Sequence, residues 1–330
     1  MSVAIGQGIR AAEDKPRKIL PSRGRADRVY RRLASGAGLF TLLILVLIGL
    51  FLVIRALPAF RQMGLAFLTT TQWQPDGVRH QFGIAAILYW TAVIAVIALL
   101  IAVPISIAGA LFINEYAPRR LRRSLTALVD LLAAIPSVIY GIWGLAFLQP
   151  QFVGVSKWIT DNLGFVPIFK TNGVNYAGSA LIAGVVVSLM VVPICTSVMR
   201  EVFSQTPPSE KEAALALGAS RWGMIRAVVL PFGRGGIIGG AMLGLGRALG
   251  ETIAVALIIS PVTVISPHIL QSGANSVAAL IALQFGEATQ KYGIPALMAA
   301  GLSLFVVTLV VNFFASMVVA RSRSGKGVEI

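Results

Sequence analysis

A single arginine lies in a stretch that is otherwise almost entirely apolar. Arg247 is near the middle of residues 235–259, which also contain Glu251 and Thr252. An arginine at the centre of a membrane span costs roughly 2.5–3.5 kcal/mol, so it rarely occurs there without a partner or a water-filled path. A guanidinium binds two phosphate oxygens at once through its fork of donors. The stretch therefore predicts an anion site in a pore.

Glu251 follows Arg247 by four residues, which places both on one face of a helix and within pairing range. We expect Glu251 to hold Arg247 when the site is empty and to accept a hydrogen bond from a protonated phosphate oxygen. An internal ion pair that only fixes helix packing is the alternative.

Small residues recur every fourth position on the same predicted helix, at Gly236, Gly240, Gly244 and Ala248. This spacing lets two helix backbones approach closely. The pattern predicts a tight helix contact beside Arg247, and simple packing within the chain explains it equally well.

A polar stretch at residues 209–231 separates two apolar ones. Ser209 followed by Glu212 reads as a capping box, Gly218 suits a C-cap, and Ser220 can cap a second helix that Pro231 would end. Ala213, Ala214 and Leu217 fall on one face of the first helix. The stretch predicts a short helix–turn–helix with a small apolar face and no core of its own.

Other chemistries find no support in the residues. No Gly-x4-Gly-Lys-Ser/Thr phosphate loop occurs, so ATP binding by such a loop is not expected. His80 and His268 have no acids or cysteines at metal-ligand spacing, and Cys195 lies inside an apolar run, where a small buried hydrophobe is expected. The sequence predicts neither catalytic residues nor a metal site.

Composition points to a membrane protein. Apolar residues make up 56% of the chain and charged residues 12%, and the mean hydropathy is +0.82. We expect an all-α polytopic protein in which six apolar stretches cross the bilayer. These stretches are residues 36–54, 83–113, 131–148, 178–199, 235–259 and 294–319. Residues 277–285 are too short to cross, and we expect a short outer-face helix or a re-entrant segment there.

The basic residues indicate the orientation. Of the 28 Lys and Arg residues, 21 fall in a flexible basic arm (1–35), a short loop with four arginines (119–123), the 200–234 segment and the tail (321–330). The positive-inside rule places these four segments, and hence both termini, in the cytoplasm. The net charge of +15 then follows from topology, and no nucleic-acid partner is required. Residues 149–177 are expected at the outer interface, and residues 36–320 form the membrane domain.

Residues 212–231 resemble the EAA loop of ABC importer permeases, written E-A-A-x3-G-x9-I-x-L-P, with Val228 in place of the isoleucine. The stretches at 134–144 (AIPSVIYGIWG) and 244–252 (GLGRALGET) are similar to PstC-type permeases of phosphate ABC importers. The resemblance extends over residues 36–320.

The resemblance implies a type I ABC importer permease fold and a role in ATP-driven phosphate import by alternating access. It implies that Glu212, Ala213, Ala214, Leu217 and Gly218 dock into an ATPase subunit, and that Arg247 and Glu251 form the charged transport pair. The expected partners are a homologous second permease, two ATP-binding subunits and an external phosphate-binding protein. The chain needs no cofactor of its own, because ATP is used by the partner subunit.

Three other functions remain open. Another oxyanion can replace phosphate as the cargo. A proton-coupled secondary transporter can use Arg247 and Glu251 as a relay, although it has no use for the 209–231 segment. A membrane signalling scaffold that reports phosphate supply can coexist with transport.

Overall fold

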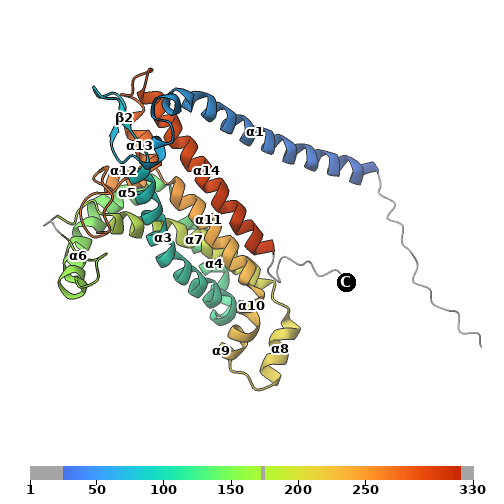
Figure 1. Ribbon diagram of the computed structural model, residues 1–330. Helices are drawn as coiled ribbons and strands as arrows, with labels where there is room; N and C mark the ends of the chain where they lie inside the picture. The colour runs from blue at the N-terminus through green and yellow to red at the C-terminus, as the bar shows by residue number, and fades with distance from the viewer. Residues whose placement is uncertain (1–24, 172–174, 321–330) are drawn as a thin grey trace, which may run out of the picture. The chain divides into compact units, whose positions relative to one another are not determined.

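The computed structural model describes residues 25–171 and 175–320, and these are almost entirely helical (Figure 1). Residues up to Ile48 and residues from Gly49 onward form two compact units. Helix α1 (Arg25–Met63) contains residues of both units. It includes residues 25–35, which the sequence predicted to be part of a flexible arm. Residues 1–24 and the 321–330 tail lie outside the described residues.

The second unit begins with the end of α1 and contains the remaining helices. In chain order these are α2 (Ala66–Thr69), α3 (Ala85–Leu111), α4 (Arg119–Ala133), α5 (Ser137–Trp143), α6 (Gln149–Leu163), α7 (Ala180–Ser204), α8 (Pro208–Ala216), α9 (Arg221–Met224), α10 (Leu230–Phe232), α11 (Arg234–Gly250), α12 (Ile253–Ile258), α13 (Val277–Gln284) and α14 (Gly293–Ala320). Three wider π-helical turns, η1 (Phe112–Tyr116), η2 (Gly144–Leu148) and η3 (Ile225–Val229), continue α3, α5 and α9. Strands β1 (Trp73–Gln74) and β2 (Gln81–Phe82) pair as a small antiparallel hairpin.

Five described helical segments are long and apolar enough to cross a membrane. They are Asp27–Met63, Ala85–Tyr116, Ser137–Leu163, Ala180–Ser204 and Gly293–Met317. A sixth crossing is reached if the bent pair Arg221–Phe232 and Arg234–Gly250 counts as one span. The predicted all-α fold with up to six spans is therefore confirmed.

The third predicted span, 131–148, has the wrong limits. Helix α4 ends at Ala133, and a new span begins at Ser137 and runs to Leu163. Pro136 lacks a backbone N–H and disfavours helical geometry at the residue before it, so the chain breaks there. Residues 149–163 therefore continue the span as α6, and the arginines at 119–123 begin α4 instead of lying in a loop.

The main core lies where α3, α7 and α11 pack together. Ser179 caps the start of α7, and the helix continues through Pro193 with buried apolar residues along it. A second core contains Phe67, Phe82 and Ile87 and lies between the hairpin, α13 and α14. The hairpin and α13 lie at one end of this unit, and α8 and α9 lie at the other (Figure 1).

The fifth predicted span, 235–259, is two helices. Helix α11 ends at Gly250, Glu251 is extended, and α12 begins at Ile253. Residues 277–284 form the short helix α13, as expected. Its first residues are held by Ser276, whose hydroxyl accepts a hydrogen bond from the Ala279 N–H at 3.1 Å.

Candidate functional site

Arg247 lies in the last turn of α11 and lines a hollow of about 480 Å³. The hollow is bounded by α7, α11 and α14, through Ile194, Gly239, Met242, Leu243, Gly246, Arg247 and Asn312. The Nε atom of Arg247 is buried and has no hydrogen-bond partner among the described residues. The C-terminal end of a helix favours a positive charge, which offsets part of the cost of placing it here.

Glu251 does not pair with Arg247, so the predicted ion pair is wrong. Glu251 directly follows the last residue of α11 and its backbone is extended, with a ψ of 127°. The structure forms no ion pair between them in the described part of the chain. Instead, Glu251 is buried, with its Oε1 atom 3.5 Å from the Ala254 N–H at the start of α12. Thr252, in the same break, donates its hydroxyl to the Gly250 carbonyl at 3.1 Å.

The glycine stripe of α11 lies directly against α7. A Cβ atom at Gly236 would come within 2.5 Å of Val202, and one at Gly244 within 2.7 Å of both Cys195 and Val191. At Gly240 the space is less tight, with Met199 at 3.2 Å. The buried Cys195 thiol donates a hydrogen bond to the Gly240 carbonyl at 3.1 Å. The stripe thus sets how closely α11 and α7 approach beside Arg247.

The polar stretch 209–231 forms short helices, but its first cap differs from the prediction. Helix α8 begins at Pro208 with Pro207 as N-cap, and no side chain caps it, so the Ser209–Glu212 capping box is wrong. The helix starts earlier because proline is favoured in a first turn. Its end is as predicted. Gly218 has a φ of +84°, and the Ala219 N–H bonds the Ala214 carbonyl, which together make a Schellman motif.

The surface of this stretch is rich in exposed apolar side chains. Leu217 is 89% exposed, Trp222 57% and Leu215 47%. Glu212, Ala213 and Gly218 are also exposed, whereas Ala214 packs against the main core. Leu217 therefore does not share a packed face with Ala214, because it lies at the helix end, in the cap position.

The second helix of the stretch leads into α11. Ser220 caps α9 by accepting a hydrogen bond from the Gly223 N–H at 3.1 Å, as predicted. Pro231 does not end this helix, because α10 continues through it to Phe232. The chain then bends by 66° into α11. Pro231 lies just after the π-helical turn η3, two residues beyond its last residue, Val229.

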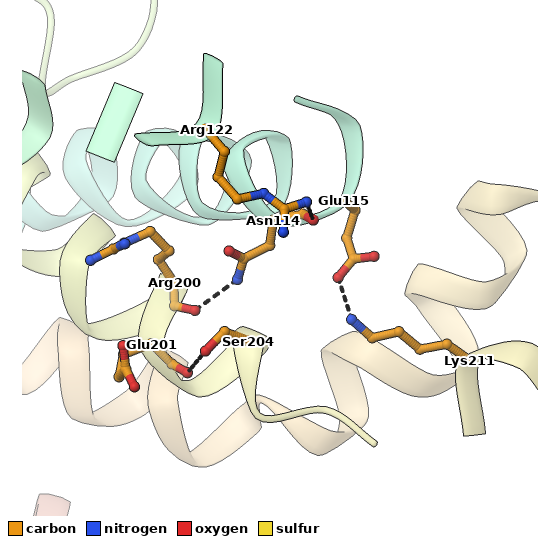
Figure 2. A network of polar contacts seen from close by, with 7 residues as sticks. All are labelled: Asn114, Glu115, Arg122, Arg200, Glu201, Ser204 and Lys211. Atoms are coloured by element: carbon orange, nitrogen blue, oxygen red, sulfur yellow. Dashed lines mark hydrogen bonds and ion pairs between the residues drawn. The ribbon is translucent and has the colours of Figure 1, made fainter. Parts of the chain in front are cut away.

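Three consecutive residues of η1 contact three different helices near this stretch, and Figure 2 shows the contacts of the first two, Asn114 and Glu115. The Asn114 Nδ2 atom donates to the Arg200 carbonyl of α7 at 2.7 Å. Glu115 Oε1 lies 2.6 Å from Lys211 Nζ of α8. The Arg221 guanidinium of α9 lies 5.4 Å from the centre of the Tyr116 ring. No sequence pattern predicted these contacts, although Glu115 is the first charge after the uncharged run 83–113.

The structure brings together no group of three or more His, Cys, Asp or Glu side chains that can hold a metal ion, within residues 25–171 and 175–320. The two histidines bond to nearby backbone: His80 Nδ1 lies 2.9 Å from the Pro75 carbonyl and His268 Nδ1 lies 3.1 Å from that of Pro167.

Comparison with known proteins agrees with these features. The family model described as "Binding-protein-dependent transport system inner membrane component" matches residues 102–324. The phosphate transport system permease protein PstC 2 of Mycobacterium tuberculosis is 41% identical over 304 residues, which cover 91% of this chain and 94% of that protein. The phosphate transport system permease protein PstC of Xylella fastidiosa is 41% identical over 306 residues, with 92% of this chain and 93% of that protein covered.

Among solved structures, a bacterial ABC transporter involved in the import of the acidic polysaccharide alginate is similar with a TM-score of 0.52. The likeness covers 89% of this chain and 99% of that chain, at 20% identity, so it shows the fold alone. The chain therefore belongs to the inner membrane components of binding-protein-dependent transport systems, and within them to the PstC-type permeases, with the helical fold of ABC importer permeases.

Proposed function

We propose that this chain is the permease subunit that moves inorganic phosphate across the bacterial cytoplasmic membrane in an ATP-driven importer. Access to a central site alternates between the two sides of the membrane. The chain pairs with a homologous second permease and two ATP-binding subunits, and it receives phosphate from an extracytoplasmic binding protein. Its termini are cytoplasmic, and it hydrolyses no ATP itself. The names of its relatives support phosphate as the cargo.

The observation that carries this proposal is the free donor capacity of Arg247. Its Nε atom is buried without a partner among the described residues, beside a hollow that it lines with Asn312. A buried donor left unpaired costs about 1–3 kcal/mol, which a phosphate oxygen would recover. Because Glu251 is engaged at the start of α12, no carboxylate of the described residues competes for the guanidinium.

Glu251 and Thr252 belong to the same pathway. They occupy the break between α11 and α12, and interrupted helices form substrate sites in many transporters. A Glu251 carboxylate that reaches the phosphate would accept a hydrogen bond from a protonated phosphate oxygen.

The coupling of transport to ATP hydrolysis involves the exposed surface of α8 and of the turn after it. Helix α8 and the turn after it present Glu212, Ala213, Leu217 and Gly218 to solvent, with Trp222 close by in the chain. An exposed apolar patch with a polar rim is typical of a protein interface. We infer that α8 docks into a cleft of the ATP-binding subunit and passes its movement to the spans on either side, α7 and α11.

The test is phosphate uptake by the complete importer in sealed vesicles, with Arg247→Gln as the variant. Uptake should fall by at least about tenfold, since a charge-assisted hydrogen bond contributes about 1.5–3 kcal/mol. Arg61→Gln, an exposed arginine at the end of α1, is the control and should transport normally. Normal uptake by Arg247→Gln in an assembled complex would rule out the anion site.

Two conditions in the same assay separate the other functions. Uptake should require ATP inside the vesicles and should persist when the proton gradient is collapsed; the opposite result would favour a proton-coupled transporter. An excess of sulfate should leave phosphate uptake unchanged, whereas strong competition would favour a broader oxyanion permease.

A further inference from the structure

The turn η1 joins helices that lie far apart in the sequence. Asn114 contacts α7, Glu115 contacts α8 and Tyr116 contacts α9, so neighbouring side chains reach separate elements. The fourth connection runs to α4, where the Arg122 guanidinium donates to the Asn114 carbonyl (Figure 2). A π-helical turn widens the helix locally, and such turns occur frequently at functional sites.

The ion pair between Glu115 and Lys211 is partly shielded from water. The Glu115 side chain is 9% exposed and the Lys211 side chain 21% exposed, with 2.6 Å between the charged atoms. Screening by solvent weakens fully exposed pairs, and a shielded pair retains more of its interaction. Removing one partner also leaves the other charge partly buried and unpaired. The contact is therefore stronger than an ordinary surface ion pair.

The ion pair connects α8 to helices that are not its neighbours in the chain. Through the chain itself, α8 is joined to α7 on one side and to α9, α10 and α11 on the other. No covalent connection of that kind links α8 directly to α3 or α4. The contacts of η1 supply such a link, because η1 continues α3 without interruption and bonds to α4 through Asn114.

We propose that Asn114, Glu115 and Tyr116 form a relay that carries the movement of α8 into α3, which belongs to the second span, and into α4, with the Glu115–Lys211 ion pair as its main link. Glu115 and Lys211 are positioning residues, since they act through the helices they join. The inference rests on the proposed function, in which docking of an ATP-binding subunit moves α8. It adds that α3 and α4 move together with α7 and α11.

The experiment measures phosphate transported per ATP hydrolysed by the complete importer in vesicles. Glu115→Gln and Lys211→Met should each lower this ratio by at least about fivefold, the lower end of usual coupling energies. ATP hydrolysis and co-purification of the subunits should remain within about twofold of wild type, because neither residue binds phosphate or ATP here. A ratio of transport to hydrolysis separates coupling from a general loss of folded protein.

Two further variants complete the design. Glu115→Lys combined with Lys211→Glu restores the opposite charges and should bring the ratio back to within about twofold of wild type, as expected for a directly interacting pair. Glu201→Gln is the matched control. The Glu201 backbone carbonyl accepts from the Ser204 hydroxyl at 2.7 Å, and the Glu201 carboxylate points away from the ion pair (Figure 2).

Each outcome decides between the two proposals. A wild-type ratio in both single variants, or no recovery in the reversed pair, overturns the relay alone. Loss of subunit assembly in the single variants also overturns it, because the pair is then only structural. If wild-type importer itself shows no ATP-driven phosphate uptake, the proposed function fails and the relay fails with it.

Discussion

At the scale of single residues, the glycines of α11 differ in how much room surrounds them. Gly244 faces α7 with no room for a methyl group, since a Cβ atom would lie 2.7 Å from Cys195 Sγ and Val191 Cγ1. Gly239, on the same helix, has no atom within 4 Å of such a Cβ. The helix contact therefore depends on particular glycines, and the periodic pattern in the sequence identifies which ones.

We predict that Gly244→Ala destabilises the protein by about 1–3 kcal/mol, because the added methyl overpacks the contact with α7. Gly239→Ala should instead stabilise it by up to about 1 kcal/mol through better helix propensity. Thermal unfolding of the purified protein in detergent measures both. Equal effects of the two substitutions would contradict the close approach of α11 and α7.

At the scale of elements, helix ends decide the shape of the functional surfaces. The end of α8 depends on the positive φ of Gly218, which turns the chain so that Leu217 stands exposed beside the start of α9. At the other end of this unit, the hairpin is hydrogen-bonded to the last residue of α13 and to the segment between α13 and α14. The Trp73 indole donates to Gln284 at 2.6 Å, and the Asp76 carboxylate accepts from the Thr289 N–H at 3.1 Å and from its hydroxyl.

Gly218→Ala should weaken attachment of the ATP-binding subunit by about 5- to 30-fold, since a left-handed conformation costs a non-glycine residue about 1–2 kcal/mol. Gly223→Ala is the control, because Gly223 has no positive φ and only ordinary contacts. Binding of the purified ATP-binding subunit to each variant gives the comparison. Unchanged binding by Gly218→Ala would mean that the end of α8 does not shape the docking surface.

Asp76→Ala should loosen the segment between α13 and α14. Loss of its two hydrogen bonds to Thr289, at about 0.5–1.5 kcal/mol each, removes about 1–3 kcal/mol in total, so backbone hydrogen exchange at residues 285–292 should become about 5- to 150-fold faster. Glu287→Gln, in the same segment, keeps the backbone hydrogen bond from the Glu287 N–H to the Gln284 carbonyl at 3.2 Å and should leave the exchange unchanged. Faster exchange in Glu287→Gln alone would show that charge, and not the Asp76 contact, orders the segment.

At the scale of the whole molecule, topology connects the two functional ends. The hairpin and the α8–α9 pair lie at opposite ends of the second unit, as Figure 1 shows. The basic residues of the 200–234 segment favour the cytoplasm for α8 and α9. We propose that the hairpin then faces the outside, the side from which the proposed binding protein delivers phosphate.

Cysteines at two exposed positions test this orientation. Leu217→Cys and Val78→Cys replace side chains that are 89% and 99% exposed, whereas the native Cys195 is buried and should not react. A membrane-impermeant maleimide added to intact cells should label position 78 only, and position 217 should react only in inverted vesicles. Labelling of both from one side would overturn the assignment of the spans.

Most of the spans and two of the helix ends in the 209–231 stretch could be predicted from the sequence alone. An apolar run must be long enough to cross lipid with its backbone bonded internally, so residues 83–113, 178–199 and 294–319 predict helices that the structure confirms. Gly218 and Ser220 were predictable for a similar reason, since each supplies a local backbone requirement.

Interruptions inside apolar stretches were decided by the tertiary structure. Composition does not distinguish a continuous helix over 235–259 from α11 and α12 separated at Glu251. The four-residue spacing of Arg247 and Glu251 therefore does not produce an ion pair, because the Glu251 carboxylate bonds at the start of α12. Likewise, Glu115 and Lys211 are 96 residues apart, and no periodicity relates them. Local patterns determine which segments enter the membrane, because each segment must bond its own backbone N–H and C=O groups within the lipid. Pairing of side chains depends instead on how the segments pack against one another.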